Sequence, residues 1–500
     1  MRVRVPAAMV VVFALLPAWL PAASDGPLID AIKHGDLPAA RGLLAEGVDV
    51  NERASDGATA LHWASYYENE EAVELLLEAD AEVNLANDLR VTPLWVASRA
   101  GSSAMVDRLL RAGADPDIAP VTGGTPLMLA VRNRDVASVN ALIDHGANVN
   151  AREAAHDQSA LMWAVARQHA DIVDALLAAG ADVHARSKSQ SRVVLLCCPA
   201  WAGDPEGTVV IDQGGLTPLL FAALDGSVDS ARRLLAAGAD VDDAAAIGTS
   251  ALMMAVHRGY RELATLLLAE GADPDAAGAG YTALHSAVLR GDEKMLEILL
   301  NSGADLNPRL ANGTFLKRGS REYAFDKFLV GATPFLLAAR AGDLGIMRRL
   351  AVAGADLSIP LEDGRTPLML AAAAERTGIR GRISEPAEPR VLETVELLIE
   401  LGADVKAVDG AGDTVVHVIA RGRPGFDTVL QFLADQGAAL QVANDQGQTP
   451  LMLALAPPAP IRGQSTTAQT VEWREAYAAW EASEGRTSTT DLLRKLGAQK

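Results

Sequence analysis

Residues 92–124 have the sequence TPLWVASRAGSSAMVDRLLRAGADPDIAPVTGG, and this stretch determines the fold because similar stretches recur along the chain. Thr92 can cap a helix through its hydroxyl group, and Pro93 follows at the first helical position, where no amide hydrogen is needed. Gly101 and Gly113 stand where two short helices must end, since glycine adopts the left-handed conformation without strain. The stretch therefore predicts two helices followed by an extended connection.

The position of Thr92 recurs with a nearly constant spacing. The corresponding residues are numbered 26, 59, 92, 125, 159, 217, 250, 282, 333, 366, 414 and 449. Most intervals are 32 to 35 residues, and the three longer ones of 58, 51 and 48 exceed one 33-residue unit by 25, 18 and 15 residues. Such a period is typical of proteins that stack one supersecondary unit repeatedly. The chain is therefore expected to contain about 12 stacked units rather than several globular domains.

The unit resembles the ankyrin repeat, in which Thr-Pro-Leu opens a helix, tight turn, helix and extended turn. The likeness covers essentially everything after residue 24. His62, His285 and His417 stand where that family often has a locally hydrogen-bonded histidine, whereas Trp95 and several methionines occupy the position elsewhere and are expected to pack as apolar groups. The resemblance implies an all-α ankyrin-repeat solenoid with β-turn fingers, and a scaffold that binds a protein partner through its concave face and finger loops.

The first 24 residues predict a signal peptide. Arg2 and Arg4 precede an apolar stretch from Val5 to Leu20, and small residues then provide a cleavage site. The apolar stretch is short and interrupted by prolines, which disfavours a membrane span, although an uncleaved anchor is the alternative. We therefore expect residues 25–500 to form the mature ankyrin-repeat domain, exported to the periplasm or secreted, without stable membrane insertion.

The composition is acidic and poor in large rings. The formal net charge is −20, and the chain is 49% hydrophobic but only 4% aromatic. Excess negative charge repels phosphate backbones and anionic lipid, so we expect a protein partner and no nucleic acid. Small apolar side chains suit closely stacked helices. We expect a monomer and no cofactor.

Four insertions interrupt the repeat, at about 186–215, 308–330, 376–390 and 457–486. The first two lie between units, where fingers project, and the last two lie between the paired helices of one unit. The third is expected to be a solvated, mixed-charge loop. The fourth predicts a helix with Trp473, Tyr477 and Trp480 on one face, which either packs on the repeats or binds a partner. Such insertions resemble those of large exported bacterial ankyrin proteins.

The first insertion predicts a β-hairpin with Cys197 and Cys198 in its first strand. Two free thiols and a vicinal disulfide are both compatible with this pair. Neighbouring Cα atoms lie about 3.8 Å apart, below the usual disulfide range, so the bond would be strained. No Cys-x-x-Cys motif accompanies the pair, and no metal ligand is assigned.

The second insertion carries a basic and aromatic segment on an acidic protein. Its candidate protein-binding residues are Lys317, Arg318, Arg321, Tyr323, Phe325 and Phe328. Basic and aromatic side chains are common anchors in protein interfaces. The alternative is that the rings pack on the solenoid while the charges lie in water.

Catalytic motifs are missing from the sequence: it has no His-Glu-x-x-His, no Gly-x-Ser-x-Gly and no phosphate loop. Acidic residues such as Asp115, Asp273 and Asp305 recur at one position of the unit, which indicates a structural role. We therefore assign no catalytic, cofactor or metal residue and expect no enzyme. The alternative is a redox or hydrolytic accessory factor with a site in insertions 186–215 and 308–330.

The two interpretations of Cys197 and Cys198 differ in their reactivity. Free thiols should both be alkylated without a reductant, and mass spectrometry of the intact protein would then show two added labels. Alkylation only after reduction would instead demonstrate the strained vicinal disulfide.

Overall fold

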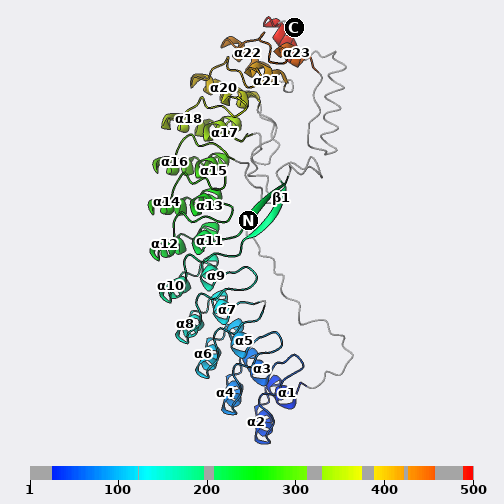
Figure 1. Ribbon diagram of the computed structural model, residues 1–500, viewed down its shortest axis with the longest axis vertical. Helices are drawn as coiled ribbons and strands as arrows, with labels where there is room; N and C mark the ends of the chain where they lie inside the picture. The colour runs from blue at the N-terminus through cyan, green and yellow to red at the C-terminus, as the bar shows by residue number, and fades with distance from the viewer. Residues whose placement is uncertain are drawn as a thin grey trace. The chain divides into compact units, whose positions relative to one another are not determined.

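The computed structural model describes residues 25–121, 123–195, 208–311, 329–373, 388–421, 426–456 and 488–498. The chain divides into two compact units, Met1–Asp182 (unit 1) and Val183–Lys500 (unit 2). Within each unit the first helices of successive pairs form one row and the second helices form another (Figure 1). The predicted signal peptide, residues 1–24, lies outside the described residues.

Unit 1 contains five helix pairs. They are α1 (Pro27–Lys33) with α2 (Leu37–Ala45), α3 (Ala60–Tyr66) with α4 (Glu70–Glu78), α5 (Pro93–Ala100) with α6 (Ser103–Arg111), α7 (Pro126–Asn133) with α8 (Val136–Asp144), and α9 (Ala160–Ala166) with α10 (Ala170–Ala178). The connections between successive pairs extend from the side of the odd-numbered helices (Figure 1).

Unit 2 contains seven helix pairs and one hairpin among its described residues. The pairs are α11 (Pro218–Asp225) with α12 (Val228–Ala236), α13 (Ala251–Arg258) with α14 (Arg261–Ala269), α15 (Ala283–Arg290) with α16 (Glu293–Asn301), α17 (Pro334–Ala341) with α18 (Leu344–Ala353), α19 (Pro367–Ala372) with α20 (Glu388–Glu400), α21 (Val415–Arg421) with α22 (Asp427–Asp435), and α23 (Pro450–Ala454) with α25 (Ser488–Lys495). The strands are β1 (Gln190–Leu195) and β2 (Thr208–Gln213). The all-α fold predicted from the repeat is confirmed.

The helix boundaries follow the predicted capping residues. The Thr92 hydroxyl accepts a hydrogen bond from the Trp95 amide at 3.2 Å, and Pro93 occupies the first helical position. Gly101 then ends α5 in the left-handed conformation, with φ of 84°. Equivalent threonine or serine caps open most first helices, so the recurring Thr-Pro signal has a direct physical cause.

The first pair is capped differently. Gly26 has no side chain that could accept the free amides at the start of α1. Glu52, from the following inter-repeat turn, accepts hydrogen bonds from Leu28 (3.0 Å) and Ile29 (3.3 Å) instead. A carboxylate at a helix N-terminus also interacts favourably with the helix dipole. The N-terminal helix of unit 1 thus depends on a residue from the next repeat.

The core consists of leucines and alanines from both rows of helices. Leu94 and Ala97 of α5 are fully buried, as are Met105 and Leu109 of α6. Alanine at the recurring position allows neighbouring first helices to approach closely, and leucine fills the space between the two rows. The predicted inward-facing positions are therefore confirmed.

The Thr-Pro-Leu-His histidines link one repeat to the next. The Nδ1 atom of His62 accepts a hydrogen bond from the Thr59 amide (3.1 Å), and its Nε2–H donates to the Val91 carbonyl (2.8 Å). Trp95 occupies the corresponding position one repeat later, and its Nε1–H donates to the Gly124 carbonyl (2.9 Å). Besides the apolar packing expected at this position, the Trp95 indole thus supplies a donor in place of the histidine donor.

The predicted hairpin in the first insertion is confirmed. Strands β1 and β2 are antiparallel, with Gln190 opposite Gln213 and Leu195 opposite Thr208. Arg186 fixes the base of the hairpin, because its guanidinium donates to the Gly215 (3.0 Å) and Ala244 (2.8 Å) carbonyls. Cys197 and Cys198, predicted for the first strand, lie outside the described residues.

The third insertion is shorter than predicted at its C-terminal end. Helix α20 begins at Glu388, so Glu388 and Arg390 are helical rather than part of the expected loop 376–390. The Glu388 carboxylate accepts a hydrogen bond from the Val429 amide at 3.3 Å, which links α20 to the start of α22. Glu388 at the start of α20 thus caps the first helix turn of α22 in the following repeat.

The histidine caps should make the stability pH-dependent. Burial lowers the pKa of His285 to about 4. The folded state therefore favours the neutral imidazole, whereas an unfolded histidine takes up a proton below about pH 6.5. The free energy of unfolding should be fully retained above pH 6.5 and fall towards pH 4, with His285 contributing at most about 3 kcal/mol.

Replacing His285→Gln should reduce this pH dependence, because glutamine keeps a donor and an acceptor but does not titrate. Urea unfolding at pH 7 and pH 4.5 measures the difference. Burial also lowers the pKa of His62 and of His257, so some pH dependence should remain. His145→Gln, at an exposed histidine, is the control. An unaltered pH dependence in His285→Gln would contradict the prediction.

Candidate interaction surface

The exposed side of the first-helix row in unit 1 is the candidate surface. The second helices pack against one side of α1, α3, α5, α7 and α9, while the last turns of these first helices carry the exposed residues. The seventh residue after each cap falls in that last turn. In repeats one to four this residue is, in order, Lys33, Tyr66, Arg99 and Arg132. One repeat position thus presents aromatic or basic side chains from consecutive helices.

Tyr66 and Tyr67, named here the tyrosine pair, form the aromatic end of this surface. Their side chains are 58% and 51% exposed, and their ring centroids lie 5.2 Å apart in an edge-on arrangement. Trp63 supports both rings from below, at 6.0 Å and 6.1 Å. The Lys33 ammonium lies 4.1 Å from the Trp63 ring centroid and pairs with Asp25. Large aromatic rings are thus held in place with half their area in water.

Arg99, Arg132 and Arg167, named here the arginine row, continue the surface along α5, α7 and the end of α9. Burial, and then the nearby Arg167 and Arg99, lower the pKa of Arg132, because both disfavour its positively charged form. Within the described residues none of the three forms an ion pair. Arg99 instead lies over the Trp95 ring, at 5.7 Å from its centroid.

The two arginines of the second helix α6 are paired, in contrast to the arginine row. Arg108 contacts Glu70 and Glu74, each at 3.2 Å, and Arg111 contacts Asp107 at 2.9 Å. Arg134, at the end of α7, pairs with Asp171 at 3.6 Å. Among the residues that the structure describes, the arginine row is therefore a local excess of positive charge without an acidic partner.

The two helix rows of unit 1 differ in the sign of their charge. Counted with their C-capping residues, the first helices carry five basic residues and one acidic residue, a net charge of +4. The second helices carry three basic and nine acidic residues, a net charge of −6. Within unit 1, basic residues thus outnumber acidic residues on the first-helix row alone.

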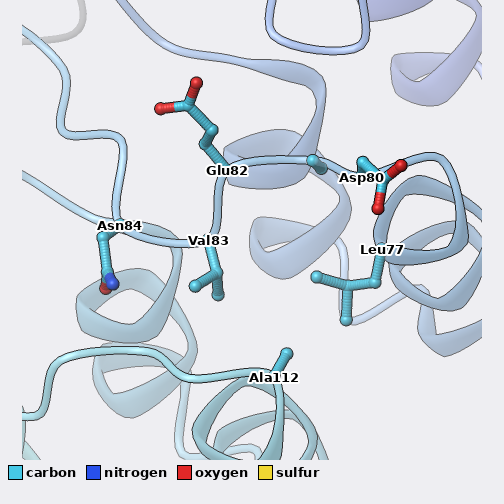
Figure 2. Close-up of a pocket in the computed structure, with 7 residues that line it drawn as sticks. Leu77, Asp80, Glu82, Val83, Asn84 and Ala112 are labelled. Atoms are coloured by element: carbon cyan, nitrogen blue, oxygen red, sulfur yellow. The ribbon is translucent and has the colours of Figure 1, made fainter.

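A separate hollow of about 610 Å³ lies where the ends of α4 and α6 meet the turn between them (Figure 2). Leu77, Val83 and Ala112 line it, with the carboxylates of Asp80 and Glu82 at its rim. The side-chain amide of Asn84, which also lines the hollow, joins two repeats by donating a hydrogen bond to the Gly113 carbonyl at 3.0 Å. The hollow is a groove between consecutive repeats and does not bring together an acid, a base and a nucleophile.

The recurring aspartates have the structural role that the sequence predicts. The Asp115 amide donates to Asn84 of the preceding repeat (2.7 Å), and its carboxylate accepts from the Asp117 amide (2.9 Å). The Asp305 amide likewise donates to the Asp275 carboxylate (2.8 Å). Among the described residues no group of three or more metal-ligating side chains occurs. None of the described helices has the length and apolarity to cross a bilayer.

The binding residues proposed from sequence lie elsewhere in the chain. Lys317, Arg318, Arg321, Tyr323, Phe325 and Phe328 all lie outside the described residues, as do Trp473, Tyr477 and Trp480. Sequence reasoning missed the tyrosine pair and the arginine row. A comparison of the repeats position by position would have found most of them, because the seventh position after the cap is basic or aromatic in each of the first four repeats.

Comparison with known proteins identifies the family. Models of ankyrin repeats in three copies match residues 28–120, 94–187, 193–278 and 219–309, and a single-repeat model matches 363–410. Because these matches cover more than half of the chain, the protein belongs to the ankyrin-repeat family.

Similarity to individual proteins is confined to short stretches. The chain is 38% identical over 68 residues to the mitochondrial disaggregase of Bos taurus, which is 14% of this chain and 10% of that protein. It is 33% identical over 75 residues to the palmitoyltransferase Hip14 of Drosophila melanogaster, 15% of this chain and 12% of that protein. The human ASB11 ankyrin repeat domain matches with a TM-score of 0.39 and 27% identity, covering 50% of this chain and 99% of that domain. The curated relatives thus share about a tenth of their length with this chain.

Exposed residues of this surface should contribute little to folding. We expect Tyr66→Ser, Tyr67→Ser and Arg99→Gln each to lower the free energy of unfolding by at most about 0.5 kcal/mol, because both tyrosines are more than half exposed and Arg99 is exposed. Leu94→Ala in the same helix as Arg99 should cost about 2–5 kcal/mol, because it opens a cavity in the core. Urea unfolding compares the variants. Surface substitutions as costly as Leu94→Ala would assign these residues a structural role.

Proposed function

We propose that this protein is an exported scaffold that binds a partner protein through the tyrosine pair and the arginine row of unit 1. Ankyrin repeats in general mediate protein–protein interaction, and family membership supports that part of the proposal. The observation that carries the particular surface is the tyrosine pair, more than half exposed, beside three arginines that form no ion pair among the described residues. Tyrosine, tryptophan and arginine dominate the energetics of protein interfaces.

Rigidity favours this surface as a binding site. Each side chain projects from a helix whose start is fixed by a cap, and Trp63 and Trp95 hold the neighbouring rings and guanidinium in place. A partner therefore meets side chains that are already ordered, which reduces the entropy lost on binding. Loops would lose more freedom when they bind.

Export is supported by the basic and apolar character of residues 1–24 and by their small-residue cleavage site. The insertions support a place among large exported bacterial ankyrin proteins. The excess negative charge supports a protein partner rather than nucleic acid. Enzymatic activity is not proposed: the match to the palmitoyltransferase Hip14 covers only 12% of that protein, so its activity does not transfer.

Affinity capture tests the proposed surface. The purified protein would be immobilised beside a triple variant, Tyr66→Ser, Tyr67→Ser and Arg99→Gln. We expect one stoichiometric partner on the unaltered protein and a loss of at least about tenfold in its affinity for the triple variant, because truncated interface anchors commonly cost this much or more. The intact mass of the exported, unaltered protein should correspond to a chain that begins at Asp25.

Two further variants make the result specific. The control is a triple variant with Ala104→Ser, Ala137→Ser and Arg111→Gln, which replaces three exposed second-helix residues. It alters the net charge by the same amount as the first-helix variant and should retain the partner. Replacing Tyr323, Phe325 and Phe328 by alanine tests the segment proposed from sequence. Retention by the first-helix variant together with loss by the alanine variant would place the binding site in the second insertion and refute the proposed surface.

A further inference from the structure

We propose that the tyrosine pair and the arginine row together bind an acidic, proline-rich segment of the partner in the polyproline II conformation, with a carboxylate at every third residue. This inference rests on the proposed function and specifies the chemistry of the partner at that same surface. It derives from charge, spacing and exposure on unit 1.

Charge selects an acidic partner. The first-helix row carries +4 while the second-helix row carries −6, so a negative segment is attracted to one side of unit 1 and repelled from the other. The arginine row has no ion pair among the described residues, so a carboxylate from a partner displaces no internal one. A guanidinium group can donate two parallel hydrogen bonds to one carboxylate. Arginine therefore binds a carboxylate more strongly than a neutral group.

Spacing selects the conformation. Neighbouring packed helices lie about 8–10 Å apart, so Arg99 and Arg132, at the same position of successive first helices, are expected at roughly that distance. Arg167 follows one position later in its repeat, at the C-terminal end of α9. A polyproline II helix has three residues per turn and rises about 3.1 Å per residue, so every third side chain faces the same way at about 9.3 Å intervals. A β-strand alternates faces with every residue and would turn each third side chain away.

The tyrosine pair explains the need for proline. Proline-rich segments dock against exposed aromatic rings, because their backbone is already extended and loses little freedom on binding. Tyr66 and Tyr67 offer two rings at 79° to each other, beside Arg99 of the next repeat. A segment that crosses the first helices therefore meets aromatic rings at one end and the cations of three successive repeats along the remainder.

Nucleic acid is the main competing anion. It would meet the same arginines, but the acidic second helices and a net charge of −20 oppose a long polyanion over the whole molecule. A short segment avoids most of that repulsion because it covers only the first-helix row. The spacing of the negative charges along the ligand, rather than their number alone, then distinguishes the acidic protein segment from nucleic acid.

Synthetic peptides test the proposal on the full purified protein. The first peptide is proline-based with three glutamates, one at every third position. The second has the same composition with the glutamates adjacent, and the third carries glutamine at the spaced positions. Fluorescence anisotropy at low ionic strength should show that the spaced peptide binds at least about fivefold more tightly than the adjacent one and about tenfold more tightly than the glutamine peptide.

Matched protein variants locate the binding. Arg99→Gln, Arg132→Gln and Arg167→Gln together should weaken binding of the spaced peptide by about tenfold or more. Arg41→Gln, Arg108→Gln and Arg111→Gln remove the same charge from the second helices and should leave the affinity within about twofold. Circular dichroism confirms that both variants fold, and a salt titration of the unaltered protein gives the charge dependence without any substitution.

Several outcomes would overturn the inference. Equal affinity for the spaced and adjacent peptides would refute the conformation, and equal effects of the two triple variants would refute the site. Tighter binding of a single-stranded oligonucleotide of the same charge would refute an acidic protein segment as the ligand. If the captured partner depends on Tyr66 and Tyr67 while no peptide binds, the acidic segment is refuted and the proposed function remains.

Discussion

Stacking of each helix pair on the next is the interaction on which the rest of the structure depends. One repeat has too little core to fold alone, so neighbouring repeats complete it. The polar contacts follow the same rule: His62 donates to Val91 and Asn84 accepts from Asp115, each joining consecutive repeats. Even the first helix obtains its cap from Glu52 of the next turn. Each unit is therefore stabilised by nearest-neighbour contacts.

Stacking also leaves certain positions free for function. The recurring leucine and alanine of the first helices in unit 1 are buried, whereas the last turn of these helices carries exposed or partly exposed residues. That turn can differ from repeat to repeat without a loss of stability. In unit 1 it carries Tyr66, Arg99 and Arg132, and the positive charge of the two arginines is opposite in sign to the net charge of the second helices. A generic scaffold thus acquires a specific surface at positions that folding does not constrain.

Much of the fold was predictable because the signals are local. Thr92 caps a helix through its own backbone geometry, and Gly101 ends it by its own conformational freedom. Contacts between repeats were less predictable. The hydrogen bond that Trp95 donates and the one that Glu388 accepts involve partners about 30 or 40 residues away, which no local pattern specifies. The binding segment proposed at 317–328 followed from composition alone and lies outside the described residues.

The sequence by itself determined the period, the helix starts and ends, the buried leucines and alanines and the excess negative charge. These properties depend on residues a few positions apart or on the chain as a whole. Tertiary structure alone decided which charges remain unpaired and which rings stay exposed. Arg108 and Arg132 are both helical arginines, but Arg108 meets Glu70 on the neighbouring second helix, whereas Arg132 meets Arg99 and Arg167 on the first helices. That difference arises because stacking brings together residues one repeat apart.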